Sequence, residues 1–277
     1  MYKVKQKFNF LLINIPIMIL SLTCIYPVIW LLYSSVKTNQ EFALSTVALP
    51  KSINMGNYIK AFVTAKFHIF IINSVFTSFC TLIIVLLASY TMGYLLSRYR
   101  FRGRNLVYIA LLAGVMIPIH ALMVPLFIQY KNFGFLDNRF SLVLPYVSIE
   151  LPTAVFLLES YIKGISTEME DAASIDGANM LQTMYGIIMP ICKPILSTVV
   201  ILTFMFAWNE FPFAQILVSD QKYKTIPVGL TYFTTQYTTD YTLLIAALCM
   251  ATIPVLVIYL LFYNKVMEGM MAGAIKG

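Results

Sequence analysis

Residues 67–97 read FHIFIINSVFTSFCTLIIVLLASYTMGYLLS, and this stretch contains no Asp, Glu, Lys or Arg. A helix needs roughly 20 mostly apolar residues to cross the ~30 Å hydrocarbon core of a bilayer. A longer uncharged run favours a transmembrane helix over a buried helix of a soluble domain. Basic residues flank the run on both sides, Lys66 before it and Arg98 after it.

Five further windows have a similar length and composition. Three of them contain no charged side chain, and two are interrupted by carboxylates, namely Glu150, Glu159 and Glu210. We therefore predict an all-α polytopic membrane protein, with residues 1–277 as a single transmembrane domain. The predicted spans cover residues 8–36, 68–97, 105–130, 141–162, 194–219 and 241–264, and a charged loop covers 163–193.

The composition excludes the common soluble classes. Hydrophobic residues make up 60% of the 277 residues and charged residues 11%, whereas soluble domains contain about 25% charged residues. Too few polar side chains are present for a cytosolic enzyme, a secreted domain or a disordered chain. Walker A, HExxH and GxSxG motifs are absent, and the four cysteines have no CxxC spacing. We therefore predict no catalytic residue, no metal site and no cofactor bound by the chain itself.

Basic residues concentrate in the N-terminus, with Lys3, Lys5 and Lys7, and in the loop from Arg98 to Arg104. Cytoplasmic loops of membrane proteins carry such an excess of Lys and Arg. Six spans put both segments and the C-terminus on one side, so we predict cytoplasmic termini. The net charge of +7 follows from this bias rather than from nucleic-acid binding.

The charged loop contains the sharpest local pattern, TEMEDAASIDGA at residues 167–178. Thr167 and Glu170 have the spacing of a capping box, which predicts the start of a helix. Gly177 favours the left-handed conformation that ends helices. A second helix is expected from Asn179 to Met189, closed by Pro190. The spacing alone is equally consistent with an ordinary pair of interfacial helices.

These residues resemble the EAA loop of permease subunits in ATP-binding-cassette (ABC) importers. The core reads Asp171-Ala172-Ala173, then Asp176-Gly177-Ala178, then Ile187-Ile188-Met189-Pro190. Asp171 replaces the usual Glu and Met189 the usual Leu, which keeps charge and bulk. Other motifs resemble the carbohydrate branch, and in particular its maltose-importer-type subunit: Arg98–Asn105, Ile117–Pro125, Trp208–Phe211, Thr225–Leu230 and Ala272–Gly277.

The resemblance implies a coupling helix that docks in a cleft of a cytoplasmic ATPase subunit. ATP is then bound by partner subunits, because this chain has no nucleotide-binding loop. The implied partners are a homologous second permease, two ABC ATPase subunits and an extracellular or periplasmic sugar-binding protein. A sugar or oligosaccharide would cross the bacterial cell membrane by alternating access. The implied ATPase-coupling residues are Glu170, Asp171, Ala172, Ala173, Asp176, Gly177 and Ala178.

The resemblance also implies that the external loop after the fifth span contacts the binding protein. The candidate residues for this contact are Thr225, Ile226, Pro227, Val228 and Gly229.

Candidates for the translocation pathway are Trp208, Asn209, Glu210 and Glu150. Ionisable groups inside a membrane are costly and are therefore functional candidates. Glu210 has two open interpretations, a hydrogen bond to a sugar hydroxyl or a structural role in the helix bundle. Glu150 has two as well, a position in an aqueous cavity or at the outer interface. Glu159 is expected to extend to the inner interface.

A stand-alone secondary transporter, driven by an ion gradient, is the alternative hypothesis. It would require buried ionisable pairs and internal inverted repeats. Glu150 and Glu210 are the carboxylates deep within the predicted spans, without a basic partner there, and the sequence has no evident repeat.

Overall fold

The computed structural model describes residues 2–234 and 240–274, with side chains described over 14–234 and 240–263. The regular elements of these residues are helices, and none is a strand, which confirms the all-α prediction. Two compact units are present: the chain up to Phe67 with Leu230–Ile253, and His68–Gly229 with the chain from Pro254 onward. The side chains of the N-terminal lysines and of the 272–277 motif lie outside the described part.

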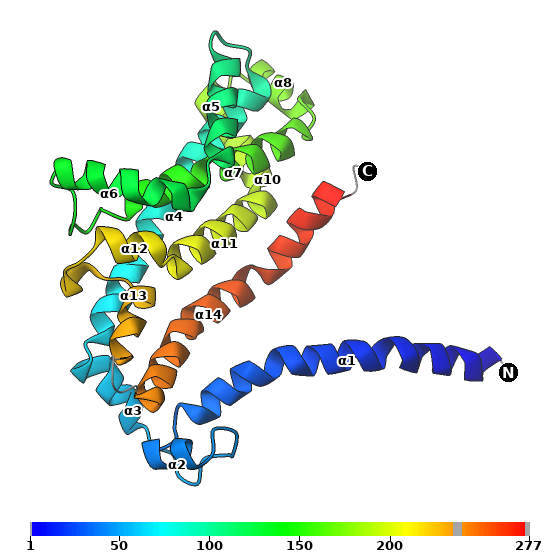
Figure 1. Ribbon diagram of the computed structural model, residues 1–277. Coiled ribbons are helices and arrows are strands. Elements are labelled where there is room, and N and C mark those ends of the chain that lie inside the picture. The colour runs from blue at the N-terminus through cyan, green and yellow to red at the C-terminus, as the bar shows by residue number, and fades with distance from the viewer. Residues whose placement is uncertain (1, 235–239, 275–277) are drawn as a thin grey trace. The chain divides into compact units, whose positions relative to one another are not determined.

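The first unit contains α1 and a folded segment that follows it. The elements are α1 (Tyr2–Ser34), α2 (Asn39–Leu44), α3 (Gly56–Ile59), the π turn η1 (Lys60–Thr64), the 3₁₀ turn η5 (Thr231–Phe233) and the first part of α14 (Tyr241–Ala274), as labelled in Figure 1. The Asn57 amide donates hydrogen bonds of 2.8 Å to the carbonyls of Ser35 and Lys37. These bonds close the segment between α1 and α3.

Lys37 forms the centre of this segment. Its side chain is 1% exposed, its Nζ donates a 2.9 Å hydrogen bond to the Thr46 carbonyl, and the same atom lies 5.1 Å from the Tyr33 ring centroid. Burial lowers the pKa of Lys37, because desolvation disfavours the charged form.

The second unit consists of helices around α4. Its elements are α4 (Phe67–Arg98), α5 (Arg104–Met116), η2 (Ile119–Leu122), α6 (Met123–Asn132), α7 (Val143–Lys163), α8 (Glu168–Ile175), α9 (Met180–Gln182), η3 (Thr183–Ile188), α10 (Met189–Ile191), α11 (Lys193–Asn209), α12 (Pro212–Leu217), η4 (Gln221–Tyr223) and α13 (Ile226–Leu230). Figure 1 shows α5 and α8 at one end of this unit and α12 and α13 farther along α4.

Four helices in the described residues are long and apolar enough to cross a membrane by themselves, over Asn14–Ser34, Phe67–Arg98, Val143–Lys163 and Tyr241–Tyr263. Two bent helix pairs raise this number to six if each pair is one span. The prediction of apolar spans is therefore confirmed, but two of the six predicted windows do not form straight helices.

The window 105–130 is broken after Met116, and its two halves meet at 94°. Ile117 is extended, with φ −71° and ψ 123°, and Pro118 follows it. Proline disfavours a helical conformation in the residue before it and lacks the N–H that a continuing helix needs. Hydropathy alone therefore predicted the wrong geometry here.

The window 194–219 is broken as well. α11 ends at Asn209 and α12 begins at Pro212, with Glu210 extended between them at φ −66° and ψ 125°. At its other end, α11 meets the stretch Met180–Ile191 at 78°. The predicted single span is therefore a series of shorter helices.

The main core joins α4, α7 and α11 to the π turn η3. Its fully buried side chains include Tyr90, Leu158, Ile162, Ile188 and Val199. Gly93 permits the close approach of α4 and α7, because a Cβ at this position would lie 3.0 Å from Cβ of Leu158. This packing fixes the end of α4 that lies beside α8.

Candidate functional site

The residues of the EAA-like loop form a helix that ends in a Schellman motif. Ala178 N–H donates to the Ala173 carbonyl at 2.9 Å, and Gly177 N–H donates to the Ser174 carbonyl at 3.1 Å. Gly177 has φ +82°, the left-handed conformation that glycine adopts without strain. The predicted glycine corner after α8 is confirmed.

The predicted capping box of α8 is wrong, although the helix begins where it was expected. Thr167 is in a helical conformation and makes no side-chain cap bond. Glu170 Oε1 instead accepts a 2.6 Å bond from Nε of Arg98, and its Oε2 accepts a 2.9 Å bond from the Tyr94 hydroxyl. A charge-assisted bond is roughly twice as strong as a neutral one, so Glu170 is drawn toward α4.

The second helix of the loop begins with a capping box that was not predicted. Asn179 Oδ1 accepts a 2.9 Å bond from Gln182 N–H, and Gln182 Oε1 accepts a 2.8 Å bond from Asn179 N–H. Pro190 does not end this helix, which continues to Ile191. Pro190 lies in the first turn of the short α10, where the missing N–H of proline is tolerated.

α8 exposes acidic and apolar side chains together. Asp171, Ala172 and Asp176 are exposed, and Ile175 is 86% exposed. Ala173 is buried on the opposite side, at 5%. The outward face therefore offers two carboxylates around an apolar centre, and small side chains that permit close packing.

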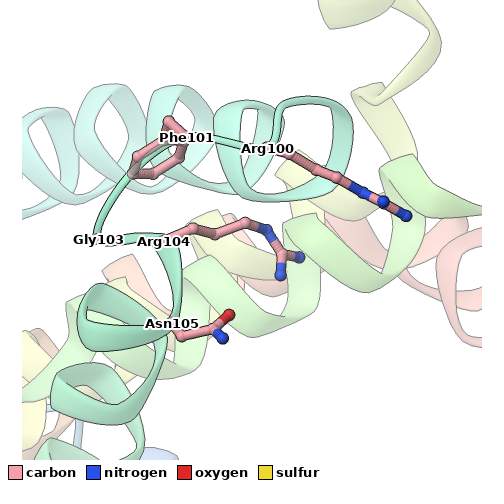
Figure 2. Close-up of a pocket in the computed structure, with 5 residues that line it drawn as sticks. All are labelled: Arg100, Phe101, Gly103, Arg104 and Asn105. Atoms are coloured by element: carbon pink, nitrogen blue, oxygen red, sulfur yellow. The ribbon is translucent and has the colours of Figure 1, made fainter.

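The basic loop between α4 and α5 lines a cavity of about 450 Å³, formed by Arg100, Phe101, Gly103, Arg104 and Asn105. Figure 2 shows that Arg100 and Arg104 extend to the same side of the loop, whereas Phe101 lies on the other. Gly103 has φ +88° and precedes the first turn of α5. The Arg104 guanidinium is partly engaged, with a 2.7 Å bond to the carbonyl of Leu96.

Glu159 does not extend to an interface as predicted. Its side chain is buried, at 5% exposure, and forms an ion pair with Lys163 one helical turn later. Arg104 Nη2 lies 3.8 Å from the same carboxylate oxygen. Two cations from different helices therefore compensate its burial.

Glu210 is buried at the break between α11 and α12. Its carboxylate accepts hydrogen bonds from the Tyr146 hydroxyl, from Phe213 N–H at 2.7 Å and from Ala214 N–H at 3.1 Å. The side chain thus caps α12 and connects it to α7. In this conformation its oxygens are occupied by the chain itself, which favours the structural interpretation.

The other pathway candidates differ in how accessible they are. Trp208 is buried, and its ring stacks on Phe204 with centroids 5.2 Å apart. Asn209 is exposed, and its amide donates to the Met205 carbonyl at 2.8 Å. Glu150 is half-buried on α7. Asn209 and Glu150 are therefore the two candidates with free surface.

The candidate residues for binding-protein contact are mostly buried within the chain. Thr225, Ile226 and Val228 are each at most 2% exposed. Ile226 N–H donates to the Ser74 hydroxyl at 2.9 Å, and a Cβ at Gly229 would lie 2.1 Å from the Phe70 ring. Pro227 is half-exposed. The motif packs on α4, and the expectation that it presents a surface does not fit this conformation.

Residues 86–264 match the family model described as the binding-protein-dependent transport system inner membrane component. The chain is 33% identical over 258 residues to the diacetylchitobiose uptake system permease protein NgcG of Streptomyces coelicolor, covering 92% of this chain and 85% of the relative. It is 30% identical over 260 residues to the sulfoquinovosyl glycerol transport system permease protein SmoH of Agrobacterium fabrum, covering 94% and 91%.

The fold is similar to that of a solved chain from a bacterial ABC transporter involved in alginate import, with a TM-score of 0.82, 22% identity and coverage of 95% and 98%. The family match decides against the secondary-transporter hypothesis, because it is long. It covers the second part of α4 and all the predicted spans that follow α4. This chain belongs to the family of binding-protein-dependent transport system inner membrane components, the permease subunits of ABC importers.

Proposed function

We propose that this permease subunit imports a sugar or an oligosaccharide and that α8 is its coupling helix. The names of the relatives NgcG and SmoH give diacetylchitobiose and sulfoquinovosyl glycerol as their substrates. These relatives cover most of the chain, which supports a carbohydrate substrate but does not favour one particular sugar.

The single observation that carries the coupling role is the exposed face of α8. Asp171 and Asp176 are positioned to pair with basic side chains of an ATPase subunit, and Ile175 supplies an apolar centre. The Schellman corner at Gly177 fixes the direction in which the chain leaves this face. A rigid, exposed and mixed acidic-apolar helix is suited to docking in a cleft of a partner.

The proposed assembly contains a second permease subunit, two ATPase subunits and an external sugar-binding protein. The ATPase subunits are required because the sequence contains no nucleotide-binding loop of its own. The basic residues around Arg100 support a cytoplasmic location of α8 and of both termini in this proposal.

For the binding protein, we propose contact through exposed residues next to the Thr225–Gly229 motif. Tyr232 is 45% exposed, and Thr231 and Thr234 are exposed. For the pathway, Asn209 and Glu150 are the candidates for contact with sugar hydroxyls.

The test uses the tagged chain purified from its source membrane, alone and with its co-purifying subunits. We expect ATP hydrolysis only in fractions that contain ATPase subunits. We also expect ATP-dependent uptake of at least one sugar of a radiolabelled panel (maltose, trehalose and diacetylchitobiose) into proteoliposomes with the binding protein. ATP turnover by the chain alone, or uptake driven by an ion gradient without ATP, would overturn the proposal.

A further inference from the structure

One face of α4 donates hydrogen bonds to the segment around α8. Tyr90, Tyr94 and Arg98 are spaced four residues apart, which places them on the same side of the helix. The Tyr94 hydroxyl and Arg98 Nε both bind the Glu170 carboxylate, at 2.9 Å and 2.6 Å. Arg98 Nη2 also donates to the Ile165 carbonyl at 2.9 Å.

The contacts reach both flanks of α8 as well as the helix itself. Ile165 precedes α8, Glu170 lies within it, and Met184, whose carbonyl accepts a bond from the Tyr90 hydroxyl, lies in the π turn η3 after it. α4 therefore binds three successive parts of the loop, although it is separated from them in sequence by 67 to 94 residues.

The groups in these bonds are shielded from water. Tyr90 and Tyr94 are 0% and 1% exposed, and the side chains of Arg98 and Glu170 are 10% and 15% exposed. A buried ion pair leaves an uncompensated charge when one partner is removed. Removing either partner of the Arg98–Glu170 pair is therefore expected to be costly.

The acidic residues on either side of Glu170 are placed differently. Glu168 is exposed, its side chain has no described contact, and Asp171 is exposed as well. Glu170 thus points toward α4, whereas the Glu168 side chain extends into solvent and Asp171 remains available to a partner. The adjacent Glu170 and Asp171 carboxylates therefore have different roles.

We propose that Glu170, Arg98 and Tyr94 form a positioning clamp that makes α8 and the C-terminal half of α4 one rigid body. This proposal rests on the proposed function, because it names α4 as the helix that receives motion from a docked ATPase. Neither α7 nor α11, which flank the loop in sequence, makes an equivalent charged contact with α8 among the described residues. Glu170 acts through Arg98 and does not contact the ATPase.

The first test measures the clamp without any partner or sugar. Hydrogen exchange of the amides of residues 168–175 is followed in the full chain in lipid nanodiscs. We expect Glu170→Gln to accelerate exchange about tenfold or more, because a charge-assisted bond to a buried group is lost. Glu168→Gln removes the same charge from the same helical turn and is expected to leave exchange unchanged. Equal exchange in the two variants overturns the clamp.

A charge swap separates pairing from folding. Arg98→Glu places two carboxylates together and is expected to accelerate exchange at least as much as Glu170→Gln. The double variant with Glu170→Arg restores an ion pair of opposite direction and is expected to recover most of the protection. If the double variant is no better protected than Arg98→Glu, then the effect is not due to this pair and the clamp is overturned.

The second test measures ATP hydrolysed per sugar transported by the reconstituted complex. We expect Glu170→Gln to keep ATP hydrolysis within about twofold and to raise the ATP-to-sugar ratio about fivefold or more, with Glu168→Gln at the wild-type ratio. Accelerated exchange with an unchanged ratio would reject α4 as the recipient of motion. A wild-type complex that takes up no sugar would reject the proposed function instead, and the exchange experiment would still decide whether the clamp exists.

Discussion

The sequence Thr-x-x-Glu occurs at the start of α2 and at the start of α8, and the two occurrences behave differently. At α2, Glu41 N–H donates to the Thr38 hydroxyl at 3.2 Å, and Thr38 N–H donates to the Glu41 carboxylate at 3.0 Å. At α8, Thr167 makes no cap bond and Glu170 binds Arg98. Two identical local signals therefore give one capping box and one long-range ion pair.

The difference follows from the groups within reach of each glutamate. Glu41 has backbone N–H donors nearby, from Thr38 and from Lys51 at 3.2 Å, so the box is its best arrangement. Glu170 has a guanidinium and a phenol from α4. A capping pattern thus predicts where a helix begins, whereas the acidic side chain goes to the strongest donor that the tertiary structure supplies.

The C-terminal ends of α2 and α8 also differ. This difference gives the prediction with the largest expected effect. α2 ends in an extended residue, Ser45, while α8 requires the positive φ of Gly177. Gly177→Leu forces a Cβ into a left-handed conformation at a cost of about 1–2 kcal/mol. No atom lies within 4 Å of the position of that Cβ, so insertion into the membrane is expected to survive.

We expect Gly177→Leu to reach wild-type membrane levels and to reduce sugar uptake roughly tenfold or more, the factor equivalent to about 1.4 kcal/mol. The leucine strains the corner and adds a bulky side chain beside the proposed docking face. Uptake is measured in vesicles at matched expression, with Ser174→Ala as the control that stays active. Wild-type uptake by Gly177→Leu would remove the coupling role from this corner.

Alanine substitution of the two threonines tests the comparison directly. Thr38→Ala removes a cap that is used and is expected to destabilise α2 by about 1 kcal/mol. Thr167→Ala removes a hydroxyl with no cap bond, so we expect no measurable change in α8. Hydrogen exchange over residues 39–44 and 168–175 measures both effects in the full chain. Equal losses of protection at both sites would mean that Thr167 caps its helix in solution.

The sequence predicted the long helices well and the bent ones poorly. α4 covers residues 67–98, close to the predicted 68–97, because an uncharged run of this length has few alternatives in a membrane. The windows around Pro118 and Glu210 are equally apolar, and their breaks depend on proline and on capping groups that a hydropathy average does not detect.

The candidate site was predictable where it depends on local chemistry. The corner at Gly177 follows from glycine alone. The partner of Glu170 lies 72 residues away, and Ile226 is bound to a serine 152 residues away. Such pairings arise from helix packing, so a single sequence does not reveal which polar residue meets which. The end of an uncharged run at Arg98 was the only local hint of the clamp.

The smallest expected effect is the pH dependence of the segment around Glu41. The Thr38 backbone N–H, with the N–H of Lys51, lowers the pKa of Glu41 against the opposing effect of burial. A carboxylate with a lowered pKa contributes stability above its unfolded pKa of about 4.3, and this stability is lost as the pH falls through the lower folded value.

Trp30 reports on this segment, because its indole N–H donates to the Thr46 carbonyl at 2.9 Å and its ring lies 6.3 Å from Phe42 of α2. In a Trp208→Phe background, we expect the Trp30 emission to change as the pH falls below about 4.3. Glu41→Gln can still form a capping box but cannot titrate, so its emission is expected to remain flat over the same range. An identical acid transition in Glu41→Gln would show that another group drives it, and the capping carboxylate of α2 would then have no part in the pH dependence of this segment.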